Sequence, residues 1–251
     1  MTLRLRATVE YDGTDFHGFQ RQKNARSVQS VLEEALSLTC EEAVGIVGAG
    51  RTDTGVHAAG QVIVFNTTWS HSITDLHKAL NMRLPDDVAV LDLMECEGSF
   101  HPRFSARSRI YEYVVSVLPV RHPLTRRYTW QITSNLDLDL MNEASGILVG
   151  EHDFAAFGSA PQGDVTVRRV VRAGWQAIER TERTIDSGLL FTIEANAFLF
   201  RMVRHIVLVL VQVGRKKIEV DSVRDILASK DSQRIKGMAP ACGLSLVKVI
   251  Y

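Results

Sequence analysis

The sequence has little cysteine and no long apolar run. Its 251 residues include only three cysteines, Cys40, Cys96 and Cys242, which lie far apart and form no Cys-x-x-Cys pair. We therefore expect neither a disulfide framework nor a zinc site. The most apolar run, residues 203–213, is too short to span a bilayer and includes an arginine and a histidine, so no membrane segment is expected.

Neither sign of charge is in excess, because 29 Lys and Arg residues balance 29 Asp and Glu residues. The balance gives no overall sign of nucleic-acid binding, which would need a local basic face. The content of 45% hydrophobic and 23% charged residues is typical of a soluble globular protein with one large domain or two small ones. Residues 1–6 lack the apolar core of a signal peptide, so we expect a cytoplasmic protein.

Strand and helix patterns alternate along both halves of the chain. In the first half, apolar periodicity and turn residues predict strands at 3–11, 61–67 and 88–95 and helices at 27–38 and 74–82. In the second half they predict strands at 109–118, 165–179, 188–194 and 244–250 and helices at 138–149, 196–214 and 222–228. Ser27 and Asn196 are the expected N-caps of two of these helices.

The repeated order of elements predicts an α+β protein of two similar halves, 1–106 and 107–251. We expect the antiparallel or mixed sheets of the two halves to meet around a central cleft. The helices are expected on the outer face.

The stretch from Gly48 to Ala58 surrounds one carboxylate, Asp53, with three glycines, and it lies between two apolar runs. Arg51 precedes the acid by two residues and His57 follows it by four. Glycines let the backbone take positive φ, and a rigid loop that presents an acid among cationic groups is suited to chemistry. The alternative is a structural Asx-turn, which most aspartates in such loops form.

Two further segments combine basic and aromatic side chains, 11–22 and 100–109. Both could stack on bases and contact phosphates through arginine. The alternatives are a polar hairpin for the first and a solvated linker between the halves for the second. A third basic cluster at 121–127 has the same ambiguity. The candidate RNA contacts in the first two segments are Arg21, Gln22, Arg103 and Arg109.

Arg109, Tyr111 and Tyr113 share one face of a predicted strand, where they could stack a base. Core packing of at least one of the tyrosines is the alternative. On the predicted helix 196–214, Arg204 falls on an apolar background and shares a face with Arg201 and His205. A buried arginine needs an anionic partner, unless it extends to water.

Taken together, these segments resemble the tRNA pseudouridine synthase A family. The motifs that carry the resemblance are Tyr-Asp-Gly-Thr at 11–14, Gly-Arg-Thr-Asp-x-Gly-Val-His-Ala at 50–58, Phe-x-x-Arg-Phe-Ser-Ala at 100–106, Arg-x-Tyr-x-Tyr at 109–113, Met-Val-Arg at 202–204 and Ala-Pro-x-x-Gly-Leu at 239–244. They run through the chain from its N-terminal strand to its C-terminal strand.

The resemblance implies an isomerase that converts uridine to pseudouridine at positions 38–40 of the tRNA anticodon stem-loop, without a cofactor or metal. It implies that Asp53 is the catalytic aspartate, that Arg204 pairs with it, and that Tyr111 stacks on the target base. Leu244 matches the apolar residue that closes over the base, and Arg51 flanks the nucleophile at the substrate. The resemblance and the basic segments together give Arg21, Gln22, His57, Arg103 and Arg109 as RNA contacts.

The family resemblance also implies a homodimer that binds tRNA. A non-catalytic tRNA-binding protein is the alternative function, in which Asp53 would be structural. A glycoside enzyme that uses the Gly48–Gly55 loop is a third possibility, but such enzymes use paired carboxylates and the stretch 48–58 holds no second acid.

Overall fold

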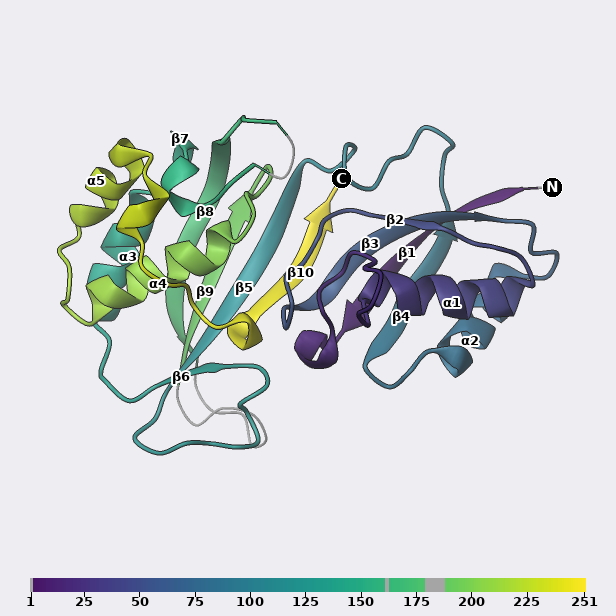
Figure 1. Ribbon diagram of the computed structural model, residues 1–251, viewed down its shortest axis with the longest axis horizontal. Helices are drawn as coiled ribbons and strands as arrows, with labels where there is room; N and C mark the ends of the chain where they lie inside the picture. The colour runs from purple at the N-terminus through teal and green to yellow at the C-terminus, as the bar shows by residue number, and fades with distance from the viewer. Residues whose placement is uncertain (1, 161–162, 179–187) are drawn as a thin grey trace. The chain divides into compact units, whose positions relative to one another are not determined.

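The computed structural model describes residues 2–160, 163–178 and 188–251. The chain divides into two compact units. Unit 1 consists of Met1–Arg107 and Ser245–Tyr251, and unit 2 consists of Ser108–Leu244. Both contain strands and helices, which confirms the predicted α+β class (Figure 1).

In unit 1, two helices pack with a mixed sheet. Its elements are β1 (Leu3–Tyr11), α1 (Val28–Cys40), β2 (Ile46–Gly48), β3 (His57–Thr67), α2 (Ile73–Arg83), β4 (Val88–Glu95) and β10 (Leu244–Ile250). The strand order is β4-β1-β3-β10, with β2 paired to β3. β1 runs antiparallel to β3 and β4, whereas β10 runs parallel to β3. Helices α1 and α2 contact each other, and both are labelled beside the sheet in Figure 1.

Local signals explain these elements. β1 alternates between buried and less buried residues, and Leu5 and Val9 are fully buried in the core. α1 begins after Ser27, which forms a capping box with Ser30. α2 ends at Arg83, two residues before Pro85, because a helix rarely continues up to a proline.

Unit 2 has an antiparallel sheet in the order β5-β9-β8-β7, with β6 parallel to β5. Its elements are β5 (Ser108–Val117), β6 (Trp130–Ile132), α3 (Leu138–Gly146), β7 (Gly150–Asp153), β8 (Val167–Ile178), β9 (Gly188–Ala195), α4 (Met202–Gly214) and α5 (Ser222–Ser229). α3 packs on β8 and α4. The amide of Asn142 on α3 bonds both backbone groups of Trp175 on β8, at 2.7 and 3.1 Å.

The compact units differ from the predicted halves, 1–106 and 107–251, in the C-terminal strand. β10 pairs in parallel with β3, through Ser245 opposite His57 and Leu246 opposite Ala58, so residues 245–251 belong to unit 1. The division of the chain into two domains at 106 stays a prediction.

The predicted start of the long helix is wrong. α4 begins at Met202, and Arg201 before it has a left-handed φ of 64°. Asn196 caps no helix, because its side-chain oxygen accepts hydrogen bonds from the backbone N–H groups of Ala197 and Arg169. Arg204 and His205 therefore lie in the first turns of α4, whereas Arg201 precedes the helix.

Other differences are smaller. β3 begins at His57, four residues before its predicted start, because pairing with β1 and β10 extends it. α3 ends at Gly146, and the short strands β6 and β7 have no predicted counterpart. The predicted end of the strand 165–179 lies outside the described residues.

Candidate active site

The Asp53 loop (residues 49–56) connects β2 and β3 in unit 1, and its acid is partly exposed. At its start, the Ala49 N–H donates to the Val62 carbonyl at 2.8 Å. Around the acid, the Val56 N–H donates to the Asp53 carbonyl at 3.1 Å, and Gly55 takes a φ of 77°. Glycine suits that position, because side chains rarely adopt such a φ. A tight turn thus presents the carboxylate.

Buried polar side chains hold the Asp53 loop in place through hydrogen bonds. The Tyr11 hydroxyl lies 2.7 Å from the Thr52 hydroxyl, and Gln61 donates to the Gly50 carbonyl at 2.9 Å. All three side chains are at most 7% exposed. Burial raises the pKa of Tyr11 to about 12, although its hydrogen bonds to Thr52 and Gln61 oppose the rise. Gly50 and Thr52, the two neighbours of Arg51, are therefore held in place, and Thr52 also directly precedes Asp53.

The segment after β1 lies directly against the same loop. The Phe19 N–H donates to the Thr52 carbonyl at 3.1 Å. A Cβ at Gly13 would lie 2.0 Å from the Val56 carbonyl oxygen, and one at Gly18 would lie 2.7 Å from the Thr52 carbonyl oxygen. These two glycines let the segment after β1 approach the backbone of the Asp53 loop closely, and this contact supports the loop.

His57 is buried at the start of β3, where its Nδ1 accepts a hydrogen bond from the Gly13 N–H at 3.0 Å. The ring therefore fixes the N-terminal segment against the loop. Its predicted RNA contact stays a prediction.

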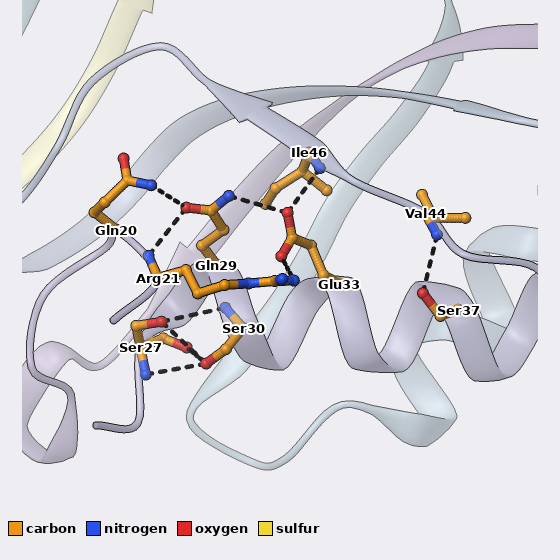
Figure 2. A network of polar contacts seen from close by, with 9 residues as sticks. All are labelled: Gln20, Arg21, Ser27, Gln29, Ser30, Glu33, Ser37, Val44 and Ile46. Carbon is orange, nitrogen blue, oxygen red and sulfur yellow. Dashed lines mark hydrogen bonds and ion pairs between the residues drawn. The ribbon is translucent and has the colours of Figure 1, made fainter. Parts of the chain in front are cut away.

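Arg51 lies beside the predicted RNA-binding segment 11–22. Arg51 is exposed, and its Nε donates to the side-chain oxygen of Gln20 at 3.0 Å. Arg21 forms an ion pair with Glu33 on α1, which Figure 2 draws. Gln22 donates to the His17 carbonyl at 2.6 Å. The structure thus brings Arg51 and the segment of Arg21 together.

Arg103 lies on the turn after β4. Its backbone N–H and that of Phe104 donate to His101 Nδ1, and its guanidinium lies 5.6 Å from the centre of the Phe104 ring. Phe104 is 73% exposed, so the turn presents a cation beside an exposed ring.

In unit 2, Tyr111 lies on β5 opposite Ile193 and is 8% exposed. Its ring meets the ring of Phe198 edge-on at 5.0 Å. Tyr113 on the same face is fully buried and donates to the Pro240 carbonyl at 2.8 Å, which confirms that one of the two tyrosines belongs to the core. Arg109 donates to the Asn196 carbonyl at 2.8 Å.

Arg204 lies in the first turn of α4 and is bound to the segment that leads into β10. Its Nε donates to the Ala239 carbonyl at 2.8 Å, and its own carbonyl accepts from the Ala239 N–H at 3.2 Å. A Cβ at Gly243 would lie 2.6 Å from the Tyr113 ring, so that segment packs closely on β5. Leu244 follows, buried at 5% exposure. Unit 2 therefore gathers Tyr113, Arg204 and Leu244 through one segment.

The supporting residues Tyr11, Gln20 and Gln61 are not among the predicted site residues, although Tyr11 and Gln20 lie in the candidate segment 11–22. Tyr11 and Thr52 are 41 residues apart, and no local pattern pairs them. Gln61 has a weak signal, since it is a polar residue at the head of an apolar strand.

In the part of the chain that the structure describes, no group of three or more His, Cys, Asp or Glu side chains could hold a metal ion. Across the same residues, every helix is too short or too polar to cross a membrane.

A family model described as tRNA pseudouridine synthase matches residues 7–105 and 144–251. These segments include Asp53, Arg204 and Leu244, whereas Tyr111 lies between them.

Proteins named tRNA pseudouridine synthase A are similar over nearly the whole chain. The one from Thermoanaerobacter sp. (strain X514) is 43% identical over 97% of each chain. Those from Thermotoga petrophila and Bacillus pumilus are 40% and 39% identical over 99% of each chain. A solved dye-decolorizing protein from V. cholerae has a TM-score of 0.19 at 12% identity, which is too low to indicate a shared fold. The chain belongs to the tRNA pseudouridine synthase family of enzymes.

Proposed function

We propose that this chain isomerises uridine to pseudouridine at positions 38–40 of the tRNA anticodon stem-loop, with Asp53 as the nucleophile. The observation that carries the proposal is the construction of the Asp53 loop. The preceding residue, Thr52, is held by a buried hydroxyl and by a backbone bond, and a glycine turn follows. A carboxylate presented by so constrained a backbone is suited to attack at a fixed position.

The reaction breaks the N-glycosidic bond and joins the same ribose carbon to C5 of the uracil. The Asp53 carboxylate attacks the ribose C1′ or the uracil C6, and the bond between C1′ and N1 breaks. The freed base turns, the bond between C1′ and C5 forms, and the bond to Asp53 breaks, which frees the carboxylate. The proton on C5 is then lost, and N1 gains one, so the mass of the RNA does not change. No cofactor or metal takes part in these steps.

In the proposal, the residues of unit 2 handle the base and the charge. The resemblance implies that Tyr111 stacks on the uracil, that Leu244 covers it, and that Arg204 pairs with the carboxylate. An arginine near a carboxylate favours its ionised, nucleophilic form. Tyr111 also suits movement of the C5 proton.

The target uridine lies in a folded arm, so it must be turned out of its stack before it reaches Asp53. That step costs a few kcal/mol, which stacking on protein and phosphate contacts offset. The proposed phosphate and RNA contacts are Arg21, Gln22, Arg51, His57, Arg103 and Arg109. We further propose that the enzyme works as a homodimer in the cytoplasm.

The test replaces Asp53 with asparagine, which keeps the size of the side chain and removes its charge. We expect pseudouridine formation on unmodified tRNA to fall by at least about a thousandfold, because the nucleophile is lost. Asp86→Asn, at an exposed loop position of the same unit, is the charge-matched control and should keep full activity. Retained turnover in Asp53→Asn would refute the role of Asp53. A wild-type chain that binds tRNA and leaves its uridines unchanged would favour the non-catalytic binding protein.

A further inference from the structure

A series of hydrogen-bonded polar side chains, called the relay below, connects helix α1 to Arg51. Its members are Glu33 and Gln29 on α1, Gln20 in the segment before α1, and Arg51 in the Asp53 loop; Figure 2 shows all but the last. Gln29 donates to Glu33 at 2.9 Å, Gln20 donates to Gln29 at 2.7 Å, and Arg51 Nε donates to Gln20 at 3.0 Å. Each bond lies within normal hydrogen-bond length.

The relay starts from a well-anchored carboxylate. The Glu33 side chain is 6% exposed, and it accepts the Ile46 N–H at 3.0 Å besides its bonds to Gln29 and Arg21. A buried carboxylate is tolerated when several donors and a cation satisfy it. Glu33 therefore ties α1 to β2 and provides a fixed acceptor.

The chemistry of the ends fixes the direction of every bond. An ionised carboxylate only accepts, so Gln29 must turn its NH₂ group toward Glu33 and its oxygen toward Gln20. That oxygen also accepts the Arg21 N–H at 3.0 Å. Gln20 must then donate to Gln29, which leaves its own oxygen for Arg51, whose guanidinium only donates. Neither amide can flip without breaking bonds at both of its ends.

The geometry points to Gln20 and Gln29 as positioning residues for Arg51, anchored on Glu33, and so for a contact between Arg51 and a tRNA phosphate. With Nε–H held by Gln20, the guanidinium plane is fixed, and the edge formed by its two Nη atoms is the one for a bidentate phosphate contact. A fixed plane lowers the entropy lost when the phosphate binds. This inference rests on the proposed function, because it takes tRNA as the ligand.

A double-mutant cycle on tRNA affinity tests the relay. Arg51→Ala should raise Kd about tenfold and Gln29→Leu about fivefold, and the double variant should remain near tenfold. A merely structural role for Gln29 would give independent effects, and the double variant would then show about fiftyfold. We also expect both single variants to reduce the salt dependence of log Kd, as for one lost phosphate contact.

Ser37→Ala is the matched control on the same helix. Ser37 accepts the Val44 N–H at 3.0 Å, so its loss also removes a bond between α1 and the chain before β2 but leaves the relay intact. Equal increases in Kd for Ser37→Ala and Gln29→Leu would overturn the inference. Gln20→Ala, at an exposed position, breaks the same relay without a change in α1 and should reproduce the Gln29→Leu result.

Pseudouridine formation, measured on the same preparations, separates this inference from the proposed function. A wild-type chain that makes pseudouridine while its variants act independently on Kd refutes the relay alone. A chain whose variants couple in binding but which makes no pseudouridine supports the relay and refutes the proposed reaction. A wild-type chain that does not bind tRNA refutes both.

Discussion

Unit 1 and unit 2 hold their candidate residues in different ways. In unit 1, Asp53 lies on an irregular loop that side-chain hydrogen bonds and two close glycine contacts keep in place. In unit 2, Tyr111 lies inside a strand and Arg204 inside a helix, where regular backbone bonds already position them. We therefore expect substitutions of residues that support the Asp53 loop to lower activity more than stability. Substitutions of residues packed against Tyr111 and Arg204 should lower stability more than activity.

The largest effect that sharpens this comparison is expected from Gly13→Ala. The new Cβ would lie 2.0 Å from the Val56 carbonyl oxygen, so the Asp53 loop or the segment after β1 must move. A displacement of about 1 Å at a catalytic group costs about a hundredfold in rate, and we expect kcat to fall by that factor. The free energy of unfolding should fall by less, about 1 to 2 kcal/mol. Steady-state kinetics and urea unfolding measure the two effects.

Gly98→Ala is the control for this prediction. A Cβ at Gly98 has no heavy atom within 4 Å, and the turn lies outside the Asp53 loop. Activity and stability should both stay near wild type. If Gly13→Ala proves as active as Gly98→Ala, the close backbone contact is not what positions Asp53.

A second, smaller effect concerns the pH dependence of stability. Burial raises the pKa of Tyr11 to about 12, against 10.0 for a free tyrosine, so the folded state favours the neutral phenol. Its contribution is complete below about pH 10 and is lost as the pH rises toward 12. We expect the free energy of unfolding to fall by about 2 kcal/mol through that window on account of Tyr11.

Tyr11→Phe isolates this contribution. The variant should lose about 1 kcal/mol at neutral pH, where the bond to Thr52 is gone, and should fall less steeply between pH 10 and 12. Urea unfolding at a series of pH values gives both numbers. Parallel curves for the variant and the wild type would mean that Tyr11 does not titrate differently in the folded state.

The sequence predicts those features of the two units that depend on neighbouring residues. Ser27 caps α1 as expected, since its capping box needs only Ser30 three residues later. The strands 3–11 and 88–95 have the predicted bounds, because alternation and flanking turns define them locally. The motif around Asp53 is also contiguous, and it identifies the loop without its surroundings.

Features that depend on distant partners are not predictable in this way. Asn196 has the cap chemistry of a helix start, but its side chain accepts a hydrogen bond from the Arg169 N–H on β8, and α4 starts six residues later. The partners of the Asp53 loop, Tyr11 and Gln61, come from two different strands, and the register of β1 on β3 brings them there. A single sequence contains the residues but not that register.

The smallest expected effect comes from Tyr113→Phe, the counterpart of Tyr11→Phe in unit 2. The lost hydroxyl leaves the Pro240 carbonyl without this bond, which costs about 1 kcal/mol of unfolding free energy. The neighbouring Ala239 keeps its two hydrogen bonds to Arg204, so the segment before Leu244 should stay in place. We therefore expect less than about a twofold change in kcat, against a larger change for Tyr11→Phe, whose bond holds the residue beside Asp53. If Tyr113→Phe instead lowers kcat strongly at nearly unchanged stability, unit 2 depends on side-chain bonds for its geometry as much as unit 1 does, and the contrast between the units fails.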